Sequence, residues 1–424
     1  MKLQPGPLRS DRPFHLANEK YGAASVKRAL ETGLVTKEDA DLIVDFVAEL
    51  KATCHIGPSR FNKITQTLIK WRHLIGPFSS NTIRNIHRGI IALETATYER
   101  FCPPYIKTPQ KYERKHLYKQ NTKHDMVKCL KRFYLWLIEQ ECSKISQSDI
   151  RKIQPPSCDP LTKNADDLLS PEEIVSLIRG CQNSRDRAII ATLYESGVRI
   201  QELATLSWSQ VTFDEYGVII NIDARTGKKT CKPRYIRLVM AREYLSTWHD
   251  DYPFQPEGKS LVFLTSRGRP LQYSGVAKQI REIAERVNIR KNITPHLFRH
   301  SRITHLLQQG YSIQTIKLMM WGSLSTEMIG VYAHLSSRDV DAEVLERNGI
   351  RVSHKASINA VPVHQCPHCQ GINGPTSNFC HLCGRPLTRA ATASQEEVMR
   401  FIESHPDLLE IISRGSRNVT TESV

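Results

Sequence analysis

The sequence predicts a multidomain, mainly α-helical protein with a small β-sheet in its second half. Three observations lead to this fold class. Segments between residues 36 and 139 place apolar side chains at helical spacing. The stretches 217–223 (GVIINID) and 234–239 (RYIRLV) alternate apolar and polar residues, as the two strands of a hairpin do. Four cysteines fall within 366–383, which indicates a small cysteine-rich module.

Composition bounds the number of domains and the kind of partner. At roughly 100–200 residues per domain, 424 residues allow two to four domains, and a hydrophobic content of 40% rules out wholesale disorder. No stretch reaches about 18 consecutive apolar residues and the first residues lack the apolar run of a signal peptide, so we expect no membrane partner and a cytoplasmic location. The net charge of +16 suits a polyanion such as nucleic acid, although a solvated basic surface would give the same balance.

The sequence pattern of 31–153 predicts a small all-helical domain, and residues 1–30 are expected to form a loosely ordered lead-in. Its clearest helix start is Thr36, which can form a capping box with Asp39. Helical spacing of apolar residues predicts four helices, at 36–51, 59–74, 81–94 and 122–139.

The stretch 100–134 is unusually basic, with ten Lys and Arg against two acidic residues. Aromatic side chains are interleaved, and cations beside aromatics are typical of a surface that follows a nucleic-acid backbone. Phe133, Tyr134 and Trp136 can equally pack the core of the domain, and we expect them there. We expect contacts with phosphates from basic residues of this stretch: Lys107, Lys111, Arg114, Lys115, Lys119 and Lys123.

A linker at 154–168, with three prolines, separates this domain from a second one at 169–350. A capped helix start follows the linker at Ser170. The second domain then mixes helices with the predicted hairpin, and 259–265 (KSLVFLT) is expected to add a third strand.

Separated pieces of the second domain suit the chemistry of a phosphate ester. Thr294 caps and Pro295 opens a helix whose first turn places His296 and Arg299 on one face. A helix N-terminus and a forked guanidinium group both favour a phosphate there. Arg199, in YESGVRIQEL, could bind the same phosphate, and two guanidinium groups would neutralise the charge of a pentacoordinate transition state.

Such a site also needs a nucleophile and a proton donor. Tyr332 suits the first role, because nearby arginines favour ionisation of its phenol. A lysine from RTGKKTCKPRYIRL could protonate the leaving oxygen. Taken singly, each of these residues is more often a helix cap or a packing residue, but the pieces together favour catalysis.

In this order the pieces resemble the tyrosine recombinase (phage integrase) family over about residues 35–350. SGVRIQEL resembles the box of the first arginine, HLFRH resembles the H-x-x-R box, and WGSLSTEMIGVYAHL resembles the segment that ends in the nucleophile. The resemblance implies that Arg199, His296, Arg299 and the nucleophile Tyr332 are catalytic. It implies that Glu202 is a supporting acidic residue.

Two positions depart from the family pattern. Trp321 stands where members usually have His, and its indole N–H can still donate a hydrogen bond to phosphate. Counting back from RYIRL favours Lys229 as the general acid, with Lys228 as the alternative, and Arg225 stands where some members have the lysine.

The resemblance implies a helical core-binding (SAM-like) domain and an α+β catalytic domain that together clamp double-stranded DNA. It implies a site-specific recombinase, or integrase, that cleaves and rejoins DNA through a 3′-phosphotyrosyl intermediate without ATP or a catalytic metal. It further implies a homotetramer on paired DNA sites, a possible accessory DNA-bending or directionality factor, and a role in integration or excision of a mobile element.

The four clustered cysteines form two C-x-x-C knuckles, ten residues apart: Cys366, Cys369, Cys380 and Cys383. Thiolates at this spacing can close a tetrahedral Zn²⁺ site, so we expect a structural zinc ribbon at 364–388. A helical tail at 389–424 follows. A ribbon in this place resembles archaeal integrase-like proteins.

Two other functions stay open. A type IB topoisomerase would use the same residue types but would relax DNA without site preference. A zinc-bearing DNA-binding regulator with weak or no catalysis would bind DNA without a covalent adduct.

Overall fold

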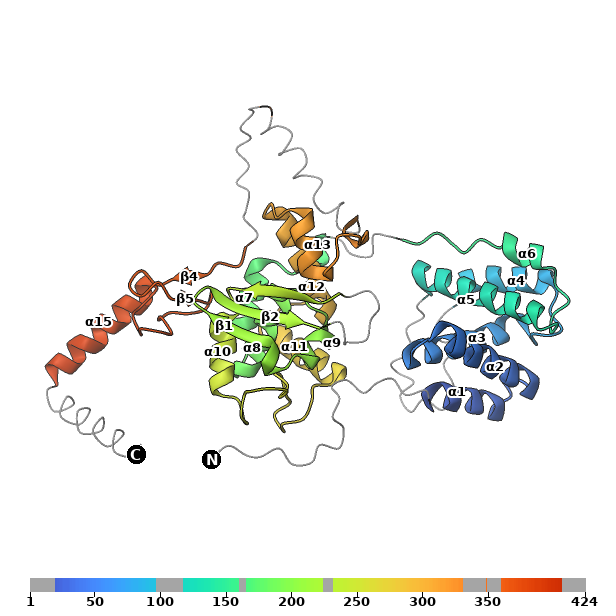
Figure 1. The fold of residues 1–424 in the computed structure, drawn as a ribbon, viewed down its shortest axis with the longest axis horizontal. Helices are drawn as coiled ribbons and strands as arrows, with labels where there is room; N and C mark the ends of the chain where they lie inside the picture. The colour runs from blue at the N-terminus through green and yellow to red at the C-terminus, as the bar shows by residue number, and fades with distance from the viewer. Residues whose placement is uncertain are drawn as a thin grey trace. The chain divides into compact units, whose positions relative to one another are not determined.

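The structure, a computed structural model, describes residues 20–96, 117–159, 165–223, 232–330, 348 and 360–405. The chain divides into two compact units (Figure 1). The helical unit is His15–Thr162, and the mixed unit is Lys163–Val424 together with Met1–Phe14.

The helical unit contains α1 Lys20–Glu31, α2 Lys37–Cys54, α3 Pro58–Ile75, α4 Ile83–Glu94, α5 Gln120–Glu139 and α6 Gln147–Lys152. Helices α2 to α5 are the four that the sequence predicted, with bounds that differ by a few residues. Helix α1 lies where the sequence predicted a loose lead-in. It forms because Val26 and Ala29 are buried, and the Gly22 N–H donates to Asn62 Oδ1 at 2.7 Å on α3.

An aromatic cluster forms the centre of the helical unit. The ring centroids of Phe46 and Phe133 lie 5.1 Å apart, and those of Phe78 and Phe133 lie 4.8 Å apart. Tyr134 is fully buried and Trp136 is buried, so the predicted core role of the aromatics is confirmed.

The predicted capping box at the start of α2 is confirmed, and it extends further than the sequence indicated. The Thr36 hydroxyl accepts the Asp39 N–H, while Asp39 also accepts the Phe78 N–H at 2.9 Å and pairs with Arg72. Burial acts to raise the pKa of Asp39, but these hydrogen bonds together hold it below its usual value.

The mixed unit packs its helices around a three-stranded antiparallel sheet in the order β1-β2-β3 (Figure 1). The strands are β1 Val211–Asp214, β2 Gly217–Ile222 and β3 Arg234–Leu238. The helices are η3 Ala165–Asp167, α7 Pro171–Arg179, α8 Ser184–Ser196, α9 Ile200–Thr205, η4 Trp208–Gln210, α10 Arg242–Asp250, α11 Tyr273–Arg286, α12 Pro295–Gln308 and α13 Ile313–Trp321. The cysteine-rich end adds β4 His364–Gln365, β5 Ile372–Asn373 and α15 Arg389–Ser404.

The predicted hairpin is confirmed as β2 and β3, whereas the third strand is not 259–265. In that segment Leu261 and Leu264 form only isolated bridges, to Ser207 and Pro270. Val262 and Phe263 are consecutive and both fully buried, so this apolar run fills the core instead of alternating across a sheet. The third strand is β1, which pairs with β2.

In the described part of the chain, no helix has both the length and the apolar character needed to span a membrane.

Candidate active site and metal centre

Arg199 is fixed by the turn between α8 and α9. Helix α8 ends at Gly197, which adopts a left-handed conformation with φ of 58°. A Cβ atom there would lie 2.8 Å from the Met320 sulfur, so a glycine is needed for both conformation and space. Two residues later Arg199 caps α9, and its side chain is 18% exposed.

Glu202 contacts both Arg199 and the first residue of strand β3 of the sheet. Its Oε2 accepts the backbone N–H of Arg199 at 2.8 Å, and its Oε1 lies 3.4 Å from Nη1 of Arg199. Arg234, the first residue of β3, pairs with the same carboxylate through Nη2 at 2.9 Å and Nη1 at 3.3 Å. Both side chains of this second pair are only 3% exposed. A buried carboxylate shared by two guanidinium groups gives Arg199 a defined orientation.

Arg299 is buried on the first turns of α12 and bridges two other elements. Its Nη1 donates to the Gly197 carbonyl at 2.6 Å, and its Nη2 donates to the Met320 carbonyl at 2.9 Å. Its guanidinium carbon lies 5.0 Å from the centre of the Trp321 ring, a cation–π distance. A planar fork suits these two contacts, because it reaches two carbonyls in fixed directions.

The end of α13 lies against the residues that lead into β3. Lys232 N–H donates to the Trp321 carbonyl at 3.3 Å, and Arg234 Nε donates to the Met319 carbonyl at 2.8 Å. Gly322 has φ of 68°, and a Cβ there would lie 2.7 Å from the Lys232 carbonyl oxygen. Segments far apart in the sequence therefore meet at one place: 197–202, 232–234, 299 and 319–322.

The other predicted residues fall in three groups. His296 is exposed on the first turn of α12, three residues before Arg299. Lys119 is exposed at the N-cap of α5, whereas Lys123 is buried and its ammonium group pairs with Glu94. Outside the described residues lie both lysines considered as general acid, the predicted nucleophile and most of the predicted phosphate contacts: Lys228, Lys229, Tyr332, Lys107, Lys111, Arg114 and Lys115.

Arg234 was not among the residues predicted from the sequence. The signal was present in the strand pattern, since Ile236 and Leu238 alternate with exposed positions and Arg234 shares their buried face. An arginine on a core-facing position needs a buried partner, and Glu202 is that partner.

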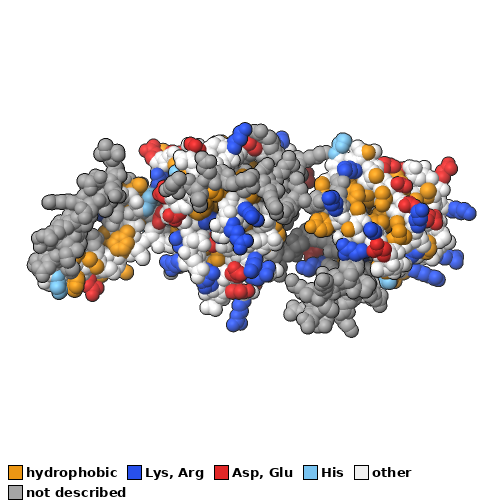
Figure 2. Space-filling model, turned by 90° about the horizontal axis from the view of Figure 1, so that it is seen from below, with side chains coloured by type: hydrophobic (Ala, Val, Ile, Leu, Met, Phe, Trp, Pro, Cys, Tyr) orange, Lys and Arg blue, Asp and Glu red, His pale blue; other side chains and the backbone are white. Residues whose placement is uncertain are grey.

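Chemically, the described residues can position and neutralise an anion. Arg199 and Arg299 come from separate helices and are oriented by a carboxylate and by carbonyls, which suits them to a phosphate whose charge grows during a reaction. Lys and Arg side chains also lie on the visible faces of both units (Figure 2).

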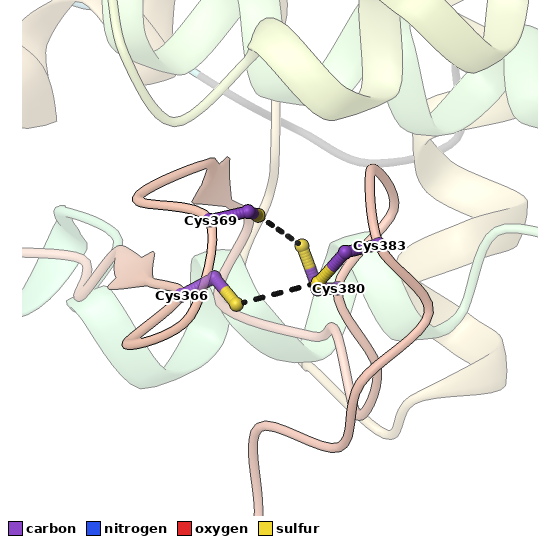
Figure 3. A group of neighbouring side chains, drawn as sticks. All are labelled: Cys366, Cys369, Cys380 and Cys383. Carbon is purple, nitrogen blue, oxygen red and sulfur yellow. Dashed lines mark hydrogen bonds between the residues drawn. The ribbon is translucent and has the colours of Figure 1, made fainter.

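The four clustered cysteines lie around one point (Figure 3). All four sulfur atoms lie within 4.8 Å of one another, with Cys366 and Cys383 at 3.6 Å and Cys369 and Cys380 at 3.5 Å. A tetrahedral Zn²⁺ with bonds of about 2.3 Å would place its sulfurs about 3.8 Å apart, so the geometry fits such an ion. The separations are far above a disulfide bond of about 2 Å.

Backbone N–H groups favour thiolates in both knuckles. Those of Cys369 and His368 lower the pKa of Cys366. Burial acts to raise the pKa of Cys380, but the N–H groups of Cys383 and Leu382 outweigh it and the pKa falls to about 6.

His381 is excluded as a ligand by its hydrogen bonds. Its Nε2 lies 2.9 Å from Arg242 Nη1, and since arginine only donates, this nitrogen accepts. Its Nδ1 then donates to Asn373 Oδ1 at 2.9 Å. Both ring nitrogens are used, and the four thiols remain as the candidate ligand set.

Part of the mixed unit is similar to known tyrosine recombinases and integrases. Residues 167–338 match the phage integrase family. The tyrosine recombinase XerD of Staphylococcus haemolyticus is 34% identical over 188 residues, which cover 42% of this chain and 61% of XerD. Transposase A from transposon Tn554 of Staphylococcus aureus is 27% identical over 184 residues, which cover 41% of this chain and 50% of the transposase.

A solved structure shares the fold. A lambda integrase dimer bound to a COC′ core site matches with a TM-score of 0.51 at 12% identity, over 70% of this chain and 77% of that one. The mainly helical class with a small sheet agrees with it. Because this chain spans between half and 61% of the length of the curated relatives named above, the activity and partners of the whole protein are proposed below.

Proposed function

We propose that this chain is a site-specific DNA recombinase that cleaves and rejoins double-stranded DNA through a 3′-phosphotyrosyl intermediate. The observation that supports it most is the convergence of Arg199, Glu202, Arg299 and Trp321 from separate segments of the mixed unit. Such a constellation suits a phosphodiester in its pentacoordinate state, and it occurs within the stretch that matches the phage integrase family.

In the proposed reaction the Tyr332 oxygen attacks the scissile phosphorus after giving up its proton. The bond from phosphorus to the 5′ oxygen breaks, and Lys229 or Lys228 supplies the proton that this oxygen needs. Arg199, Arg299 and His296 stabilise the charge on the non-bridging oxygens, and the Trp321 indole N–H supplies a further donor. The ester energy stays in the phosphotyrosine, so a 5′-hydroxyl of another strand reverses the step without ATP or a catalytic metal.

We further propose that four copies assemble on two DNA sites and that the exchange serves integration or excision of a mobile element. The similarity to a transposon's transposase supports the second point. The basic stretch of the helical unit would bind DNA phosphates through Lys107, Lys111, Arg114, Lys115 and Lys119. Lys123 is left out of this surface because its ammonium group is paired with Glu94.

We also propose that the cysteine module, residues 364–388, is a zinc ribbon. The fit of four sulfur atoms to a tetrahedral ion supports this. The module is too short for a core of its own, so binding of the metal, on the order of 10 kcal/mol, would supply its folding free energy.

Covalent capture tests the main proposal. Wild type and Tyr332→Phe are incubated with fragmented genomic DNA and denatured, and the DNA retained on protein is sequenced. We expect adducts from wild type only, focused on one sequence. Dispersed adducts that depend on Tyr332 would indicate a topoisomerase, and tight binding without any adduct would contradict the proposed chemistry.

A further inference from the structure

The cysteine module packs on the start of α10 through hydrogen bonds to consecutive residues. The Gly374 N–H donates to Glu243 Oε2 at 2.6 Å, and the Ser377 hydroxyl donates to the same oxygen. The hydroxyls of Tyr244 and Thr376 lie 2.7 Å apart. The two surfaces pack closely at this interface, since a Cβ on Gly374 would lie only 2.5 Å from the Tyr244 hydroxyl oxygen.

A second line of contacts starts at a candidate metal ligand. The side-chain amide of Asn373, fully buried, donates to Cys380 Sγ at 3.7 Å. Its oxygen accepts from His381, whose other ring nitrogen accepts from Arg242 at 2.9 Å. Hydrogen bonds therefore connect a cysteine sulfur to the first residue of α10.

The residues just before α10 are fixed by α8. The buried Glu195 carboxylate accepts the N–H groups of Val239, Met240 and Ala241 at 2.8, 3.0 and 2.8 Å. Glu195 stands four residues before Arg199 in the sequence. The start of α10 therefore contacts the cysteine module, and the residues just before it contact the helix that leads to the candidate active site.

We propose that Zn²⁺ bound by the four cysteines stabilises the start of α10 and, through it, the mixed unit. This inference rests on the proposed zinc site. Without the ion, the loops that carry Gly374, Ser377 and His381 have no core to fix them, and their contacts with α10 are lost. Glu243 then loses the two hydrogen bonds that its carboxylate accepts from the module. The module is thus a metal-dependent support of the recombinase fold.

Hydrogen exchange of the full chain, with bound zinc counted separately, tests this. Wild type is compared after loading with Zn²⁺ and after chelation. We expect the amides of 239–250 to exchange about tenfold faster after chelation, while those of α2 in the helical unit stay unchanged. Equal exchange in 239–250 with one zinc bound per chain would overturn the inference. If no zinc binds at all, the proposed metal site itself fails.

Two variants separate contact with α10 from metal binding. Glu243→Gln removes the negative charge of the side chain that accepts two hydrogen bonds from the module. Gly374→Ala places a methyl group against Tyr244. Both variants leave the four cysteines intact. We expect each to bind one zinc while the zinc-dependent protection of 239–250 falls to less than half. Glu282→Gln, which removes a half-exposed carboxylate on α11 paired only with Lys278 in the described contacts, is the matched control and should keep full protection. Full protection in both interface variants would contradict the proposed route.

Discussion

Replacement of Arg234 by Met removes one partner of the buried ion pair with Glu202. Arg234 and Glu202 are each 3% exposed, and removing one partner of a buried pair costs about 3–5 kcal/mol. The lost bond from Nε to the Met319 carbonyl adds about 1 kcal/mol. Glu202 keeps its contacts with Arg199, which reduces the total. We expect a loss of about 3 kcal/mol in the free energy of unfolding of the mixed unit, on the order of 10² in the ratio of folded to unfolded protein.

The assay is hydrogen exchange of the slowest amides of α8 in the full chain, since these report global unfolding of their unit. Arg237→Met is the matched control on the same strand. Arg237 pairs with Asp214 at 2.8 and 2.7 Å, but this pair is exposed, so its loss should change stability little. Equal losses of stability in the two variants, or a loss below about 1 kcal/mol in Arg234→Met, would show that the buried pair with Glu202 does not stabilise the unit.

Three further predictions follow from the same contacts and charges. Arg299→Lys should reduce covalent adduct formation by about 10²-fold or more, because one ammonium group cannot reproduce the fork between the Gly197 and Met320 carbonyls; near-normal adduct yield would remove Arg299 from the site. Burial, with the nearby Arg302, lowers the pKa of His305 to about 4 from 6.5, so the folded state binds fewer protons between these values. The unfolding free energy of the mixed unit should therefore be level above about pH 6.5 and fall by up to about 3 kcal/mol as the pH drops to 4. His305→Gln should remove this fall. An unchanged pH dependence in that variant would assign the fall to other groups. DNA affinity should drop on the order of 10³-fold between about 50 and 200 mM salt if six or more phosphates are contacted, and a flat response would exclude a basic clamp.

Features that depend on neighbouring residues were predictable from the sequence. The capping box of Thr36 with Asp39 and that of Ser170 with Glu173 are both present, because each is formed within one turn. The hairpin β2–β3 follows from the alternation of apolar residues, and the cysteine cluster follows from the spacing of its knuckles. Arg199 and Arg299 were predicted as candidates because each lies in a compact motif.

The distant partners of buried charged residues were not predictable, although the alternation of β3 indicated that Arg234 itself faces the core. Arg234 is buried because Glu202, 32 residues earlier, accepts from it, and Lys123 is withdrawn from the surface by Glu94, 29 residues earlier. The four residues of β1 contain only two apolar side chains, so pairing with β2 decides their conformation more than their own pattern does. The contact of the cysteine module with Glu243 spans more than 130 positions and left no local signal.

Identification of the residue that carries the DNA tests directly whether Tyr332 is the nucleophile. Adducts formed by wild type on a captured site are trimmed with nuclease, digested with trypsin and sequenced by mass spectrometry. We expect a nucleotide attached through its 3′ phosphate to Tyr332, in the peptide that ends at Arg338, with a free 5′-hydroxyl on the other side of the break. A nucleotide on any other residue, or a 5′ linkage, would contradict it.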